Sequence, residues 1–126
     1  MFSIVKVDTQ NKVSVIHVKN KMLTDNVLND LVSGSAELVY LSRLPDLVMI
    51  VNENGHQLRL PINYVGSGLY GNPESAVVGD IYLASVDSKF RSPKTDVYAF
   101  DLINGLLVKS MCEKLIEEYR KANLIN

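Results

Sequence analysis

The chain has 126 residues, of which 47% are hydrophobic and 21% charged, a composition typical of a single globular domain over residues 1–126. Its 13 basic and 14 acidic side chains give a formal net charge of −1, which argues against general nucleic-acid binding, because that needs an excess of Lys and Arg. Apolar runs are far shorter than the roughly 20 residues that span a bilayer, so no membrane association is expected. The single cysteine, Cys112, excludes an internal disulfide framework and fits the cytoplasm, where we expect the protein to reside.

The first third of the chain predicts a β-hairpin followed by a short helix. Residues 3–8 and 13–18 are rich in Val and Ile and are joined by a polar stretch, as in two antiparallel strands. Thr24 can cap the helix, and apolar residues recur after it at helical spacing. Gly34 is the expected left-handed residue that ends this helix.

The next segment predicts the centre of a sheet. A strand is expected over 37–42, and the apolar run 47–51 has no alternation, which is typical of a strand covered on both faces. Asn54-Gly55 is the commonest dipeptide of a tight hairpin turn, so residues 47–62 are predicted to form a central hairpin. Pro61 cannot donate to a ladder, which places its strand at an edge or an end.

The second half predicts a loop, a strand and a long helix. Residues 64–79 are glycine-rich and predict a long loop, a class that is often functional. A strand is expected over 81–86, a polar connection over 88–96, and a strand or a helix lead-in over 97–100. The last helix has one apolar stripe, formed by Val108, Met111, Cys112, Leu115, Ile116, Tyr119 and Ala122.

These elements predict an α+β fold. We expect a mostly antiparallel sheet of about five to seven strands with two helices packed on one face.

Residues 66–71 match the pattern G-x-G-x-x-G. In a dinucleotide site such glycines lead a strand into a helix whose N-terminal amides meet the pyrophosphate. Here the pattern runs into Asn72-Pro73-Glu74, which offers no such helix, so an ordinary glycine-rich loop is favoured. A loop that wraps an anion through its amides, with Ser67 and Tyr70, is the open alternative.

Other candidate chemistry is weaker. His17 and His56 lie in different predicted hairpins without further ligands at metal spacing, so neither a metal nor a cofactor is expected. Cys112 lies in an apolar stripe, where a thiol is usually a small hydrophobe. Ser67 has no plausible His and Asp partners. We therefore do not expect an enzyme.

The polar quartet 52–55 has two interpretations. Asn-Gly can make a turn that the preceding side chains complete by hydrogen bonds to the backbone. Alternatively, Glu53, Asn63 and Asp80 cluster at one end of the sheet as a recognition patch. The candidate binding residues are Asn52, Glu53, Asn63, Ser67, Tyr70 and Asp80.

Four stretches within residues 24–87 carry a resemblance to a known family. They read LVSGSAELVYL, DLVMIVNENG, LPIN and VVGDIYLAS, and their order and spacing resemble small proteins of unknown function from bacteriophages and mobile elements. The matching positions are Gly34, Glu37, Asn52, Glu53, Gly55, Leu60, Pro61, Asn63, Gly79 and Asp80. Ser35-Ala36 departs from the pattern, because the family tends to have a larger residue there.

The resemblance implies context rather than chemistry. It suggests a small cytoplasmic phage-type accessory protein that acts by binding and inhibits a host antiviral defence component by protein–protein contact. The alternative is an oligomeric sponge that sequesters a nucleotide second messenger through its glycine-rich loop. We also expect a homodimer, because two helices cannot cover both faces of the sheet and because Met111 and Tyr119 suit an interface.

Overall fold

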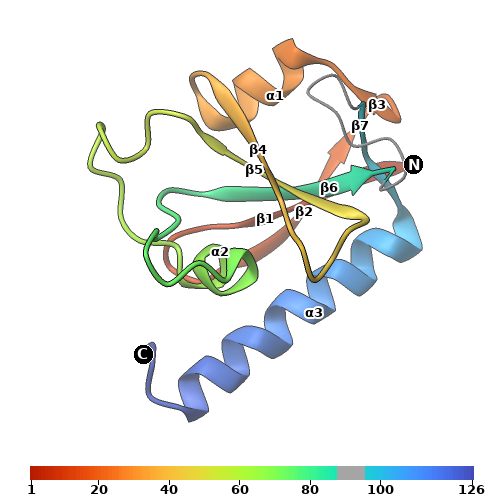
Figure 1. Ribbon diagram of the computed structural model, residues 1–126. Helices are drawn as coiled ribbons and strands as arrows, with labels where there is room; N and C mark the ends of the chain where they lie inside the picture. The colour runs from red at the N-terminus through yellow and green to blue at the C-terminus, as the bar shows by residue number, and fades with distance from the viewer. Residues whose placement is uncertain (88–95) are drawn as a thin grey trace.

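The computed structural model describes residues 1–87 and 96–126, and it has one antiparallel sheet with helices on both faces (Figure 1). The strands are β1 Phe2–Val7, β2 Val13–Val18, β3 Met22–Leu23, β4 Ala36–Tyr40, β5 Leu47–Asn52, β6 Ile81–Val86, β7 Val97–Tyr98 and β8 Phe100–Asp101. The helices are α1 Asp25–Val32, α2 Tyr64–Tyr70 and α3 Leu102–Lys121. The main strand order is β2-β1-β6-β5-β4, with β3, β7 and β8 pairing off this path. The predicted α+β class and antiparallel sheet are confirmed. Of the predicted connection 88–96, residues 88–95 lie outside the described residues.

The unalternated apolar run is the inner strand β5. Val48, Met49 and Ile50 have no exposed surface, as predicted for a strand covered on both faces. Met49 belongs to the core cluster that also contains Cys112 of α3, whereas Val48 and Ile50 belong to the cluster around Leu28 of α1. The run lacks alternation because each of its faces meets a different core.

The three helices divide between the two faces of the sheet (Figure 1). α1 packs on one face through Leu28, with Thr24 as its predicted N-cap. α2 and α3 cover the other face, where Val65, Cys112 and Ile116 are buried. The prediction of two helices on one face is therefore wrong in this detail: the two predicted helices, α1 and α3, lie on opposite faces, and the additional helix α2 lies on the same face as α3.

The predicted hairpin over residues 47–62 does not form. β5 ends at Asn52, and the chain continues through successive turns to a single bridge between Ile62 and Val78. Neither Asn54 nor Gly55 has a positive φ, which a tight Asn-Gly hairpin turn requires. Gly55 is instead buried, with so little space that an added Cβ would lie 2.8 Å from the Val78 side chain. Gly55 is therefore needed for close packing against Val78, and not for the tight turn that the Asn-Gly dipeptide predicted.

The predicted loop over residues 64–79 begins with α2. Asn63 is its N-cap and accepts a hydrogen bond from the Gly66 amide at 2.9 Å, and Gly71 ends it with φ 73°. Val65 and Leu69, four residues apart, both pack against the core. The low helix propensity of two internal glycines is thus outweighed by a strong cap and an apolar face.

The end of α1 also differs from expectation. Ser33, not Gly34, adopts the left-handed conformation, with φ 54°. Gly34 lies against Asn52, whose side-chain Nδ2 would be 3.0 Å from a Cβ at position 34. This glycine is needed for close approach to β5 rather than for its backbone angles.

Candidate functional site

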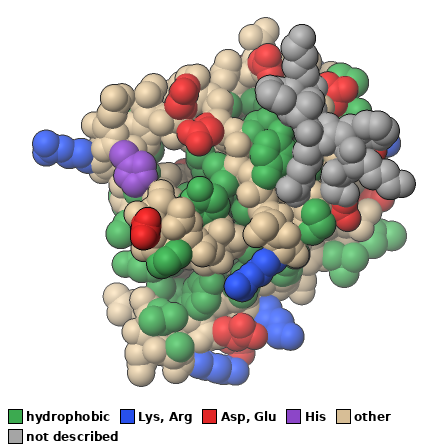
Figure 2. Space-filling view, viewed as in Figure 1, with side chains coloured by type: hydrophobic (Ala, Val, Ile, Leu, Met, Phe, Trp, Pro, Cys, Tyr) green, Lys and Arg blue, Asp and Glu red, His purple; other side chains and the backbone are tan. Residues whose placement is uncertain are grey.

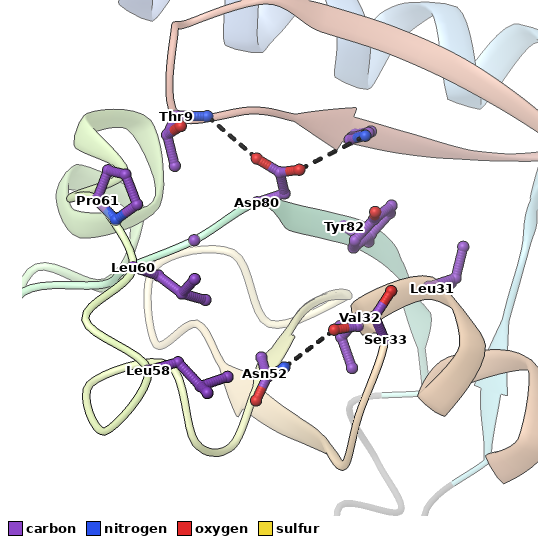
Figure 3. A pocket seen from close by; sticks show the side chains of 12 residues that line it. Thr9, Leu31, Val32, Ser33, Asn52, Leu58, Leu60, Pro61, Asp80 and Tyr82 are labelled. Atoms are coloured by element: carbon purple, nitrogen blue, oxygen red, sulfur yellow. Dashed lines mark hydrogen bonds and ion pairs between the residues drawn. The ribbon is translucent and has the colours of Figure 1, made fainter.

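The largest described depression that contains predicted site residues is an open groove of about 430 Å³ (Figure 3). One wall comes from the end of α1, and the opposite wall from the segment that follows β5. The floor lies on β1 and the start of β6. The side chains that shape it are Leu31, Val32 and Ser33 on the first wall, Leu58, Leu60 and Pro61 on the second, and Lys6, Asp80 and Tyr82 on the floor.

The charged groups of this groove are paired with each other. Asp80 Oδ2 lies 3.6 Å from Lys6 Nζ, and Asp80 Oδ1 accepts a hydrogen bond from the Thr9 amide at 3.2 Å. Lys6 Nζ also lies 5.8 Å from the centroid of the Tyr82 ring. Burial raises the pKa of Tyr82, and the neighbouring Lys6 partly offsets this rise. Asp80 therefore ties the turn after β1 to the start of β6, and its carboxylate is paired with Lys6.

A second, smaller hollow of about 140 Å³ lies on the other side of Asn52. It is lined by Glu37, Glu53, His56 and Tyr70 among others. Glu53 Oε2 accepts a hydrogen bond from Ser35 Oγ at 2.8 Å. His56 Nε2 lies 3.0 Å from the Ala76 carbonyl oxygen, which can only accept, so this nitrogen carries the proton. The hollow is acidic and has polar groups on its rim.

Asn63 and Ser67 are structural residues of the interior. Asn63 is fully buried, and its Nδ2 donates to the carbonyl oxygens of Val7 at 2.9 Å and Gly79 at 3.0 Å. Ser67 Oγ accepts from the Val77 amide at 2.9 Å and contacts the Val77 carbonyl oxygen at 3.3 Å. Both side chains thus form hydrogen bonds with backbone groups of the 77–79 segment, as buried polar groups generally do.

Asn52 joins α1 to the end of β5. Its Nδ2 donates to the Val32 carbonyl at 3.0 Å, and its Oδ1 accepts from the Asn54 amide at 2.8 Å (Figure 3 shows the first bond). This carbonyl is one of those that the end of a helix leaves without an intrahelical partner. Asn52 thus supplies the hydrogen bond that solvent would otherwise donate at the C-terminus of α1.

The six predicted residues therefore occupy three different settings. Asn52 and Asp80 line the groove, and Asn52, Glu53 and Tyr70 line the second hollow. Asn63 and Ser67 hold the connection between β5 and β6. The expected single patch of Glu53, Asn63 and Asp80 is not formed, since Asn63 is buried. A binding role for the exposed members stays a prediction.

Packing accounts for most of the positions that carry the family resemblance. Gly79 has φ 81°, and an added Cβ there would lie 2.8 Å from Leu60. Gly55 meets Val78 in the same way, and Asn63 bonds β1 to the segment before β6. In this chain, these residues fix the path from β5 to β6.

A surface that the sequence reasoning missed lies at the start of α3. The predicted stripe began at Val108, but the helix begins at Leu102, and its first two turns expose large aliphatic side chains. Four side chains form this α3 apolar surface, with exposed fractions of 46% for Leu102, 71% for Ile103, 50% for Leu106 and 62% for Leu107. The signal was present in the sequence LINGLL, directly before the stripe.

The rest of α3 packs within the chain. Cys112 is fully buried, and burial raises the pKa of its thiol to about 12, as expected for a small hydrophobe rather than a nucleophile. Met111 packs against the same core, and the hydroxyl of Tyr119 lies close to Gly68 of α2. These two side chains were expected at a dimer interface, but they contact the protein's own sheet and helix.

Comparison with protein families, with curated proteins and with solved structures finds no match for this chain. Within residues 1–87 and 96–126, no helix has the length and hydropathy needed to cross a membrane. In the same ranges, no three His, Cys, Asp or Glu side chains form a group that could hold a metal ion.

Proposed function

We propose that this protein is a small phage-type accessory protein that acts by binding a host protein, and that the α3 apolar surface is the contact. The observation that carries the proposal is the exposure of Leu102, Ile103, Leu106 and Leu107 in two successive helical turns. Single exposed aliphatic residues are normal, but a contiguous group is characteristic of an interaction site.

The magnitude of this exposure is substantial. Complete burial of one aliphatic side chain is worth about 1.5–3 kcal/mol, and these four side chains retain roughly half of that potential. Met1 is also exposed, and the pairing of Phe2 with Asp101 brings the start of β1 to the start of α3. Polar residues such as Asn104 and Ser110 border the α3 apolar surface on the same helix. An apolar centre with a polar rim is the usual anatomy of a protein interface.

The choice of a host defence component rests on the resemblance to phage and mobile-element proteins. A homodimer, which the sequence also led us to expect, is the competing use of the same surface. No observation on the described residues favours the nucleotide-sequestration alternative, because the loop on which it depended begins with a capped helix.

The test compares two variants that each add one negative charge to the surface. Ile103→Asp places the charge within the α3 apolar surface, whereas Gln57→Asp places it on an exposed position in the turn after β5. A photo-reactive residue at position 106 should crosslink to a host protein in infected cells, and the crosslink should be lost with Ile103→Asp but not with Gln57→Asp. Phage plating on a host with intact defences should fall in parallel.

Light scattering distinguishes self-association through this surface from binding of a host protein. A species of twice the 14.0 kDa chain mass that Ile103→Asp converts to a monomer would assign the surface to self-association and refute the proposal. Equal crosslinking and equal plating with both variants would refute it as well.

A further inference from the structure

The strand β4 forms one edge of the main sheet. It pairs with β5 on one side, and no described strand pairs with its other side. The Glu53 amide donates to the Ser35 carbonyl at 2.8 Å, so Glu37 and Val39 also direct their backbone groups toward β5. Ala36 and Leu38 consequently direct theirs outward. The Ala36 amide is bonded to Asn29 Oδ1 at 2.9 Å, which leaves the Leu38 backbone as the centre of the available edge.

Side-chain hollows flank this edge on both faces of the sheet. On the α1 face, Ala36, Leu38 and Tyr40 line a depression of about 460 Å³ with Leu28, Asn29 and Asp25. On the opposite face, Glu37 and Val39 line the hollow of about 140 Å³ described above. An extended peptide that added to β4 would point successive side chains to opposite faces. It would therefore place alternate side chains in the two hollows, which is how strand-addition sites obtain specificity.

The charge of this edge defines the occupant further. Asp25 lines the first hollow, and Glu37 and Glu53 line the second. No Lys or Arg lines either one among the residues that the structure describes. Figure 2 shows acidic side chains over α1 and the start of β4. A second copy of this chain would bring the same acidic side chains to this edge, whereas a basic segment would meet them with opposite charge.

We propose that β4 binds an extended segment of a partner protein by strand addition, and that this segment alternates basic side chains toward Glu37 and Glu53 with apolar side chains toward Leu28 and Leu38. The main-chain bonds form at Leu38, and the charges select the partner. The inference goes beyond the proposed function, because it concerns a different surface and does not depend on the α3 apolar surface.

The probe for this proposal is a short capped peptide in which Val and Lys alternate, titrated into the isotope-labelled full chain. We expect the largest NMR shifts at the amides of residues 36–40. A peptide with Glu in place of Lys should not bind. A peptide with N-methyl groups on the amides that would face β4 should not bind either, since it cannot donate main-chain hydrogen bonds to β4.

Matched variants separate charge from general effects. Glu37→Lys should weaken the Val–Lys peptide by about tenfold, the effect of losing one favourable ion-pair interaction at the site. Glu118→Lys makes the same charge change on an exposed position of α3 and should leave binding unchanged. Leu38→Pro removes the outward amide and should abolish binding. If that variant does not fold, the N-methylated peptide tests the same bond.

Several results would overturn the proposal. They are absence of binding, equal binding of the Lys and Glu peptides, or shifts centred on the Lys6–Asp80 groove. In those cases the charge of Glu37 only disfavours pairing of β4 with another strand. Ile103→Asp should bind the peptide normally, so a failure at β4 and a failure at α3 are distinguishable.

Discussion

Replacement of Asn63 by Ala should strongly destabilise the protein. The wild-type side chain has three buried hydrogen bonds, to the Val7 and Gly79 carbonyls and from the Gly66 amide. Each buried polar group that loses its partner costs about 1–3 kcal/mol. The two carbonyls can keep other contacts, so the lower end of this range applies to them. With the lost helix cap, we expect a total loss of about 3–5 kcal/mol.

The measurement is urea unfolding followed by far-UV circular dichroism, since the chain has no Trp. With a slope of about 1.5 kcal/mol per molar urea, a loss of about 4 kcal/mol lowers the unfolding midpoint by roughly 2–3 M. Asn72→Ala is the matched control. Asn72 Oδ1 also accepts a backbone hydrogen bond, from Glu74 at 3.0 Å, but it is exposed and water can replace it. Its effect should stay within about 0.5 kcal/mol.

The pH dependence gives a second test of the same reasoning. Asn63→Asp would place a carboxyl against two carbonyl oxygens in a buried site, which raises its pKa in the folded state above the unfolded value. The folded variant then binds the proton more tightly, so its stability is greatest at low pH and falls as pH rises through the folded pKa.

In urea unfolding, a midpoint shift for Asn63→Ala no larger than that for Asn72→Ala would refute the assigned role of Asn63.

Three further predictions concern the packing of α3. Ser3 Oγ is buried without a partner among the described residues, so Ser3→Ala should be neutral or stabilise by up to about 1 kcal/mol in urea unfolding. A Cβ at Gly105 would overlap this hydroxyl, so Gly105→Ala should lower the free energy of unfolding by about 1–2 kcal/mol. Most of this loss should disappear in the double variant with Ser3→Ala, and additive effects would contradict the contact. The buried Cys112 thiol should react with a thiol reagent only at the rate of global unfolding, and rapid labelling of the native protein would contradict its burial. Burial raises the pKa of this thiol to about 12, so its contribution to stability is present below pH 9 and is lost as pH rises toward 12.

The sequence predicted the elements whose signal is local and strong. The apolar run in β5, the Val- and Ile-rich hairpin of β1 and β2, and the Thr24 cap of α1 were all confirmed. These depend on hydrophobic pattern and on a cap within a few residues, which a single sequence contains. The α+β class follows from them.

The errors came where distant contacts override local preference. Asn54-Gly55 predicted a hairpin turn, but Gly55 is used to admit Val78, which lies far along the chain. The glycines of 64–79 predicted a loop, but the Asn63 cap and the packing of Val65 and Leu69 form α2. The same applies to the candidate site. The sequence predicts Asn63 as a binding residue, but its partners are backbone groups that only the folded chain brings near.

The position of β1 has a consequence for how the chain folds during synthesis. β1 has β2 on one side and β6 on the other, and Val5 lies opposite Leu83. The hairpin of β1 and β2 is complete early, but its inner edge stays open until β6 has been made. At roughly 5–20 residues per second, this delay lasts on the order of several seconds. During that interval an unpaired, apolar strand edge is exposed in the nascent chain, so it is open to aggregation and to chaperones until β6 pairs with it.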